Sequence, residues 1–195
     1  MALAEKNQRR REILEAALLC FSELGIESTT IDMIKTQSGA SVGSIYHHFS
    51  NKEGVATALY IAALEDHANQ QFALLEQANS AESTIKALVY AYLDWVTANP
   101  ELALFVQQAR GYVLNSAHAD LLISRNRERF AQLLSYLNRY SEDGSLRIFP
   151  KELYTALVLG ATKDYCRNWL SGRIKTPPAD YRDILAEAAW RTVSV

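Results

Sequence analysis

The amino-acid sequence predicts an all-α protein, and three observations support that prediction. Apolar residues recur every three or four positions along most of the chain, the spacing that places them on one face of a helix. Serine, threonine or asparagine stands before several of these segments and glycine or proline after them, as at helix ends. No segment alternates apolar and polar residues with the two-residue period of a strand. We therefore expect about nine helices.

The first expected helix lies in "REILEAALLCFSELG" and ends at Gly25. Thr29 or Thr30 then supplies a side-chain oxygen that caps a second helix, "IDMIKTQS", which ends at Gly39. The apolar face of the first helix consists of Ile13, Leu14, Ala17, Leu18, Phe21 and Leu24.

A short third helix and a long fourth helix follow. Ser41 is placed to cap the third helix, "VGSIYHHF", and Ser50 or Asn51 is placed to cap the fourth. The apolar positions of the fourth helix include Val55, Leu59, Phe72 and Leu75.

The remainder of the chain continues the helical pattern, and its breaks are "ANPE", "NSAH", "SEDGSLRIFP" and "SGRIKTPPAD". Pro178 suits the first turn of the last helix, where its missing N–H has no intrahelical partner to lose. These later helices are expected at about 81–98, 101–114, 117–140, 150–172 and 178–193.

Composition excludes several classes of protein. The chain has 195 residues, of which 49% are hydrophobic and 22% charged, as in globular domains. It contains no apolar run of the roughly 20 residues that would span a bilayer. The segment "MALAEKNQRRREILEAA" lacks the apolar core of a secretory signal. We therefore expect a cytoplasmic location and no membrane partner.

Cysteines and histidines show no metal-binding or cofactor pattern. Cys20 and Cys166 are far apart and have apolar neighbours, which favours buried thiols in a reducing compartment. We expect no metal and no cofactor. The histidines form no H-x-x-x-H pattern and have no C-x-x-C pair beside them: they are His47, His48, His67 and His118.

One motif raises the question of catalysis. Residues 39–43 match G-x-S-x-G, the nucleophile elbow of serine hydrolases, in which a strand leads into the serine. Here a helix is expected before Gly39, and no sheet is predicted. His118 lies downstream beyond an acidic residue, and nothing indicates that it faces Ser41. A small hydrolase using Ser41 is a remote alternative, and we expect no enzyme.

The same segment suits a helix-turn-helix DNA-binding module. Ile45 and Phe49, four residues apart, would face a small core, and the opposite face of 42–48 would be exposed. Gly43 has no side chain, so the backbone there can approach DNA closely. The formal net charge is −2, so phosphate contact must depend on a local patch such as "QRRR" at 8–11.

The stretch "TTIDMIKTQSGASVGSIYHHFSNKEGV" resembles the DNA-binding signature of the TetR family of bacterial transcription regulators. The resemblance covers about residues 10–56 and includes the spacing G-x-S-x-G-x-x-Y-x-H-F-x-x-K-E. Two residues depart from the usual alanines around the turn: Lys35 and Ser38. We expect a DNA-binding domain over 1–54 and an effector-binding and dimerisation domain over 55–195.

The resemblance implies roles for individual residues. Thr30 would contact phosphate from the start of the second helix. His48 is open to two interpretations, a phosphate contact or an inward structural position. Base-facing positions on the third helix would be Ser41, Val42, Gly43 and Ser44. Backbone anchors would be Tyr46, His47 and Lys52.

The resemblance also implies partners. The protein would be a homodimer formed through its last two long helices, and it would bind a palindromic operator as a repressor that an unknown small molecule releases. The alternative is a regulator of the same fold with no small-molecule effector, which answers to a protein partner or acts as a nucleoid factor. Candidate effector-binding residues are Trp95, Phe105, Arg110, Tyr112 and His118.

Overall fold

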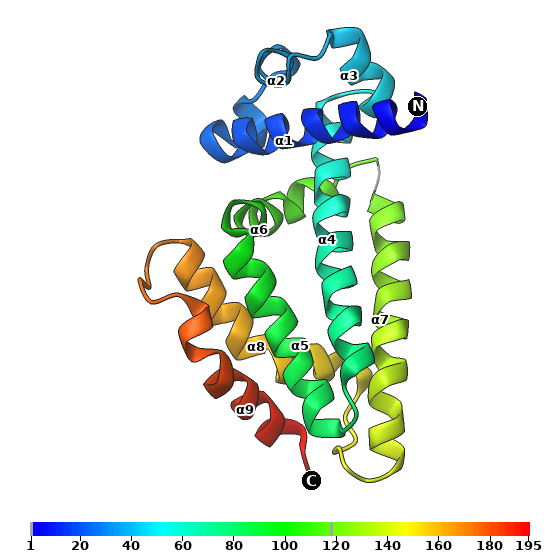
Figure 1. Ribbon diagram of the computed structural model, residues 1–195, viewed down its shortest axis with the longest axis vertical. Coiled ribbons are helices and arrows are strands. Elements are labelled where there is room, and N and C mark those ends of the chain that lie inside the picture. Colours follow the sequence, from blue (N-terminus) through cyan, green and yellow to red (C-terminus); the bar gives the residue numbers. More distant parts are fainter. Residues whose placement is uncertain (1, 118) are drawn as a thin grey trace. The chain divides into compact units, whose positions relative to one another are not determined.

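The computed structural model describes residues 2–117 and 119–195, with side chains from Asn7 onward, and it is helical throughout (Figure 1). Over these residues the only β-type pairing is an isolated antiparallel bridge between Leu146 and Ser194, which confirms the all-α prediction. The helices are α1 (Ala2–Ser28), α2 (Ile31–Ser38), α3 (Val42–Phe49), α4 (Lys52–Gln77), α5 (Ala81–Ala98), α6 (Pro100–Leu114), α7 (Ala119–Glu142), α8 (Lys151–Leu170), the 3₁₀ turn η1 (Pro178–Tyr181) and α9 (Arg182–Val193).

The boundary between α1 and α2 differs in detail from the prediction. Gly25 does interrupt α1, with φ 78° and ψ 160°, but helical hydrogen bonding resumes and continues to Ser28. Thr29 is buried and donates its hydroxyl to the carbonyls of Cys20 and Gly25, at 3.1 and 2.8 Å. Thr30 is the residue that caps α2. Thr29 therefore stabilises the kink in α1, and Thr30 caps the start of α2.

The last helix also begins differently from the prediction. Pro178 starts a single 3₁₀ turn, and regular α-helix follows only from Arg182. Proline is accepted there for the expected reason, because the first helical N–H has no intrahelical partner. No helix in the part of the chain that the structure describes is long and apolar enough to cross a membrane.

Packing divides the chain into two compact units. Unit 1 comprises the chain up to Leu64 together with Glu101–Ile123, and unit 2 comprises Glu65–Pro100 together with Ser124–Val195. Helices α4 and α7 contribute residues to both units, and α6 belongs to unit 1 from Glu101 onward. These units do not test the expected assignment of DNA binding to 1–54 and of effector binding and dimerisation to 55–195, which stays a prediction.

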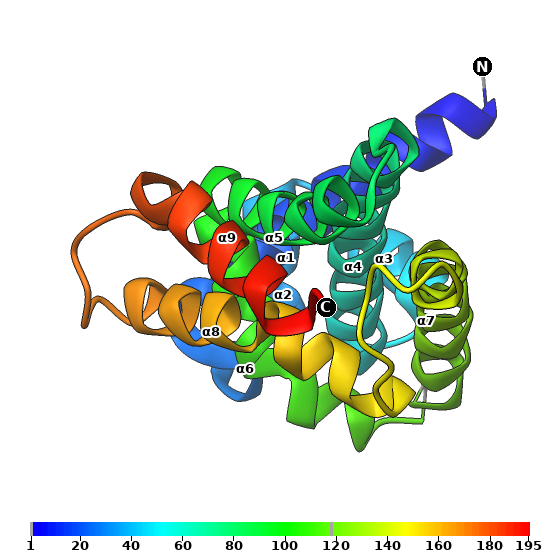
Figure 2. The ribbon, with the colours of Figure 1, turned by 90° about the horizontal axis from the view of Figure 1, so that it is seen from below.

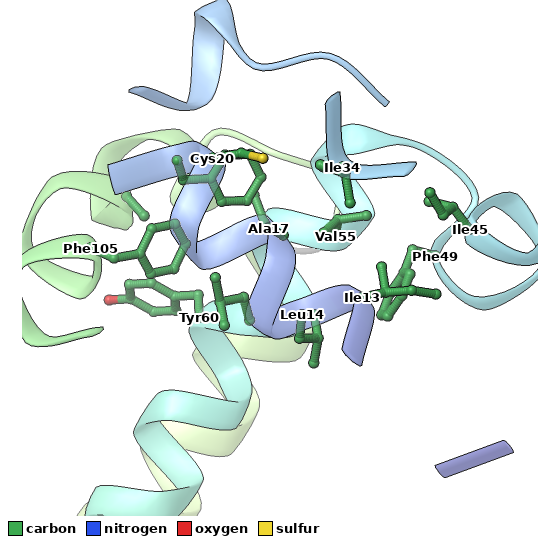
Figure 3. Packing of buried hydrophobic residues seen from close by; sticks show 14 of the residues in the cluster. Ile13, Leu14, Ala17, Cys20, Ile34, Ile45, Phe49, Val55, Tyr60 and Phe105 are labelled. Atoms are coloured by element: carbon green, nitrogen blue, oxygen red, sulfur yellow. The ribbon is translucent and has the colours of Figure 1, made fainter. Parts of the chain in front are cut away.

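Unit 1 has a core that joins the three N-terminal helices to α4 and α6. Figure 3 shows Ile13, Ile34, Ile45, Phe49 and Val55 among its side chains, each at most 6% exposed. Helix α6 extends this core, because the Phe105 ring stacks on the Phe21 ring with centroids 5.7 Å apart. Burial of these apolar side chains is what holds the short helices α2 and α3, which would not be stable alone.

Unit 2 contains a second core in which α5, α8 and α9 pack against one another, as Figure 2 shows. Cys166 of α8 is fully buried there, and burial raises the pKa of its thiol to about 12, so the group stays neutral. The burial of both cysteines agrees with the sequence-based expectation.

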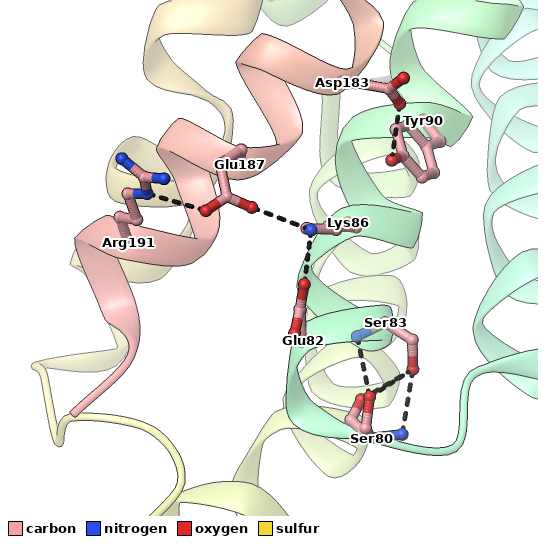
Figure 4. A network of polar contacts seen from close by, with 8 residues as sticks. All are labelled: Ser80, Glu82, Ser83, Lys86, Tyr90, Asp183, Glu187 and Arg191. Atoms are coloured by element: carbon pink, nitrogen blue, oxygen red, sulfur yellow. Dashed lines mark hydrogen bonds and ion pairs between the residues drawn. The ribbon is translucent and has the colours of Figure 1, made fainter.

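Polar contacts join α5 to α9 along the outside of this core (Figure 4). Lys86 pairs with Glu82 on its own helix and with Glu187 of α9, the latter at 2.9 Å. Tyr90 donates its hydroxyl to Asp183 at 3.0 Å. These exposed pairs set the register of α9 on α5 more than they stabilise the fold, because solvent screens each of them.

Candidate DNA-binding surface

The turn between α2 and α3 is built from local hydrogen bonds. Gly39 adopts the left-handed conformation, with φ 63°, and donates its N–H to the carbonyl of Lys35 at 2.9 Å. The Ser38 hydroxyl accepts the N–H of Ala40 at 3.2 Å, and Ala40 is buried. Lys35 is exposed. Both departures from the family pattern are therefore accommodated, because Ser38 adds a hydrogen bond and Lys35 points to solvent.

Helix α3 has one face in the core and one in solvent. Ile45 and Phe49 are 0% and 6% exposed, as the four-residue spacing predicted, whereas Tyr46 is 49% exposed and His47 is exposed beside it. A side chain on Gly43 would meet no protein atom closer than 4.0 Å. The outer face of α3 is therefore polar, uncrowded and free of a cover from unit 1.

Two hydroxyls stand at the start of helices. Thr30 Oγ1 accepts the N–H of Met33 at 3.3 Å, and Ser41 Oγ accepts the N–H of Ser44 at 3.1 Å. A hydroxyl that accepts one bond keeps its own proton to donate. Helix N-termini also attract anions, through their unpaired N–H groups and the helix dipole. Both positions can thus hold a phosphate oxygen without losing the helix cap.

The candidate backbone anchors differ in availability. Lys52 donates its ammonium Nζ to the carbonyl of Glu27 at 2.7 Å, so in this structure it is engaged within the protein. The guanidinium of Arg10 lies 5.5 Å from the centroid of the Phe49 ring, which places one positive charge of the "QRRR" segment next to α3. His48 is half-buried, with its ring 5.8 Å from Phe49. Its ring also lies 5.5 Å from that of exposed His47, so the two interpretations of His48 both stay open.

The G-x-S-x-G match does not have the geometry of a nucleophile elbow. A nucleophile elbow needs a strand running into the serine, and here α2 and a left-handed glycine precede Ser41. The hydroxyl of Ser41 caps α3, and this accounts for its place in the motif.

The candidate effector-binding residues are divided between the two units, and their role stays a prediction. Trp95 is buried in unit 2, where its indole N–H donates to Asp66 at 2.8 Å. Phe105 belongs to the core of unit 1. Arg110 is exposed and Tyr112 half-buried, both in unit 1, and His118 lies outside the described residues.

Unit 2 has a groove between α4 and α7 that the sequence analysis missed. Its volume is about 450 Å³, which is within the usual range for small-molecule sites. At one end, Arg125 and Arg129 both pair with Glu65. Burial and the charge of Arg125 lower the pKa of Arg129. The groove is lined by Glu65, Ala68, Asn69, Phe72, Ala73, Glu76, Arg125, Glu128, Arg129 and Gln132.

A signal for this groove is present in the sequence. Arg125, Arg129 and Gln132 stand four and three residues apart, which puts them on one face of a helix. Polar residues at that spacing ordinarily mark a solvated face, and only the position of α4 beside α7 distinguishes a groove from a surface.

Comparison with known proteins identifies the module. Residues 13–59 match the sequence profile described as bacterial regulatory proteins, tetR family. The chain belongs to the TetR family. The profile covers the turn, the capped α3 and the start of α4, and these are the elements whose geometry forms the outer face described above.

TetR-family proteins with similar sequence or structure extend the match over the whole chain. The transcriptional repressor KstR2 of Rhodococcus jostii is 26% identical over 142 residues, or 73% of this chain and 70% of KstR2. A TetR family regulator from Marinobacter aquaeolei VT8 has the same fold, with TM-score 0.83, 16% identity and coverage of 100% and 99% of the two chains. FadR of Bacillus subtilis, solved with stearoyl-CoA, gives TM-score 0.77 at 16% identity, covering 93% and 98%.

This TetR-family chain is therefore a DNA-binding transcription regulator with a helix-turn-helix module and a larger helical part, as the sequence analysis predicted.

Proposed function

We propose that the chain acts as a homodimeric repressor that binds a palindromic operator and releases it when a small molecule binds in the helical part. The observation that carries this proposal is the outer face of α3, on which exposed polar groups surround a glycine with open space above it. KstR2 of Rhodococcus jostii is named a repressor, which favours repression over activation.

DNA contact would be shared between two classes of residue. The caps Thr30 and Ser41 would donate their hydroxyls to phosphate or to a base edge. Tyr46 and His47 would donate to phosphates and so fix the register of α3 in the major groove. Val42, Gly43 and Ser44, toward the start of α3, would lie nearest the bases, where recognition helices read sequence. Lys52 would reach phosphate only after leaving the Glu27 carbonyl.

The dimer would form through α8 and α9. Leu153 and Ile184 are 44% and 67% exposed, and Ala161 and Ala188 on the same two helices are also exposed. Large and small apolar residues on two adjacent exposed helices suit a close helix–helix interface. A two-fold dimer presents two copies of α3 to two half-sites, and this supplies the specificity that one short helix lacks.

The effector would bind in the groove between α4 and α7. Phe72, Ala68 and Ala73 provide an apolar surface, and Arg125 and Arg129 provide donors for an anionic group that would replace Glu65 between them. Stearoyl-CoA, bound to the FadR relative, is an amphipathic anion of this kind. Glu76 and Glu128 also line the groove and would disfavour a ligand with negative charge along its whole length.

Release requires that the effector prefer a conformation with the wrong separation of the two α3 helices. Helix α4 carries groove residues at one end and follows α3 directly at the other, so a change in its position acts on both sites. A coupling of about 1–3 kcal/mol between the two sites is typical and would lower operator affinity five-fold or more.

The first experiment is a selection of random duplex DNA on the purified full-length protein at near-physiological salt. We expect an enriched palindrome with half-sites spaced for a two-fold dimer. Fatty acids and acyl-CoA thioesters of graded chain length are then titrated into the complex, with Arg129→Gln as the matched variant. Operator release by none of them would favour the alternative regulator without a small-molecule effector. Binding that shows no sequence preference and disappears as salt rises would contradict the proposal itself.

A further inference from the structure

The first two residues of α4, Lys52 and Glu53, each form a hydrogen bond to a different segment of unit 1. Lys52 donates its ammonium to the carbonyl of Glu27 at 2.7 Å, at the end of α1. Glu53 uses Oε1 to accept the backbone N–H of Ala117 at 2.9 Å, just beyond the end of α6. Residues 64 positions apart in the sequence are thus joined by one charge-assisted hydrogen bond.

The Ala117 side of this bond is anchored by local hydrogen bonds and by a buried helix. The N–H groups of Asn115 and Ser116 bond to the carbonyls of Gly111 and Val113, at 3.2 and 3.1 Å, and so continue α6 as a tight turn. Val113 is fully buried, and α6 is fastened further along by the Phe105–Phe21 stack. The donor at Ala117 is therefore presented by a helix that is part of the unit 1 core.

The Glu53 side is connected to α3 by an equally tight turn. Ser50 donates its N–H to the carbonyl of Tyr46 at 2.9 Å, Asn51 donates to Phe49 at 2.7 Å, and the side chain of Asn51 accepts the N–H of Gly54 at 2.7 Å. These bonds leave little freedom between the end of α3 and the first turn of α4. A tilt of that first turn is consequently passed on to α3.

We propose that Glu53 is a positioning residue for DNA binding, because its bond to the Ala117 N–H sets the orientation of α3 relative to α6. Glu53 does not touch DNA in this proposal. It acts through the turn that connects it to α3, and the free protein already holds α3 in one orientation. Tyr112 lies within electrostatic range of Glu53, since its pKa is raised by burial and by the charges of Glu53 and Glu27.

The test compares Glu53→Ala with Glu53→Gln, whose amide oxygen still accepts a hydrogen bond. Amide hydrogen exchange is measured by NMR on the free full-length protein, well below its melting temperature. We expect Glu53→Ala to exchange faster at Ala117 and along Ile45–Phe49, and Glu53→Gln to stay near the wild type. Glu23→Ala, which removes an exposed acid of α1, serves as the charge control.

Operator affinity provides the second readout. Glu53→Ala is expected to weaken binding about tenfold, the scale of one charge-assisted hydrogen bond, and Glu53→Gln by no more than about threefold. Ala117→Pro removes the donor N–H instead of the acceptor, and in that background Glu53→Ala should have no further effect on exchange along α3.

Unchanged exchange along α3 in Glu53→Ala, or equal damage by Glu53→Gln and Glu53→Ala, would overturn the assignment. Additive effects of Ala117→Pro and Glu53→Ala would do the same. Exchange is measured without DNA, so this result stands whether or not the proposed operator function holds.

Discussion

Gly43 and Gly54 lie eleven positions apart in the same motif, yet their surroundings are opposite. A Cβ on Gly54 would stand 1.9 Å from the backbone oxygen of Phe49, whereas a Cβ on Gly43 would meet nothing closer than 4.0 Å. The α3–α4 turn thus requires glycine for the fold itself. No described part of the protein requires a glycine at position 43, the second residue of α3. The comparison separates a motif glycine that the fold requires from one that the fold leaves open to contact with a partner.

Of the substitutions that test this comparison, Gly54→Ala is expected to lower the free energy of unfolding most. The added methyl group would collide with backbone, which cannot move aside as a side chain can, so the α3–α4 turn must open. We expect a loss of about 3 kcal/mol or more in the free energy of unfolding, at the upper end of overpacking effects. Chemical denaturation monitored by circular dichroism measures it. A variant with wild-type stability would show that the turn is less confined than described.

Neighbouring residues on opposite faces of α3 sharpen the same contrast. Ile45→Ala empties a fully buried position and should cost about 3 kcal/mol of stability. Tyr46→Phe removes only an exposed hydroxyl and should change stability by less than about 0.5 kcal/mol, while weakening binding to operator and random DNA alike. Denaturation and DNA titration on both variants test this. An Ile45→Ala protein that keeps its stability would place Ile45 outside the core.

Ser41 is both the cap of α3 and a candidate DNA contact, and two substitutions separate these roles. Ser41→Ala removes the cap of α3 and should cost about 1 kcal/mol of stability as well as operator affinity. Ser41→Asp keeps a capping oxygen and should preserve stability, but its negative charge should lower DNA affinity further than alanine does. Wild-type DNA affinity in Ser41→Asp, with the loss confined to Ser41→Ala, would show that Ser41 acts only as a cap.

The sequence predicted most of the helices, because their apolar periodicity and capping residues are local signals. Ile45, Phe49 and the caps Thr30 and Ser41 lie where the motif spacing placed them. The resumed turn after Gly25 could not be predicted, because it depends on Thr29 reaching the carbonyl of Cys20 nine residues away.

The site was less predictable than the fold wherever it depends on contacts between distant segments. The engagement of Lys52 by Glu27 and of Glu53 by Ala117 joins residues 25 and 64 positions apart. Phe105, a candidate effector-binding residue, stacks on Phe21 in the unit 1 core, a contact that its sequence context does not reveal. Periodicity shows that a helix has an apolar face and does not show which neighbour covers it.

The most direct test of the account is Gly43→Ala, measured for stability and for operator binding on the same preparation. Because alanine favours helix over glycine and the space is open, we expect stability to rise by up to about 1 kcal/mol. Operator affinity should fall, because the methyl group would stand between the backbone of α3 and the DNA. A variant that is more stable and still binds its operator with wild-type affinity would contradict the assignment of this face of α3 to DNA.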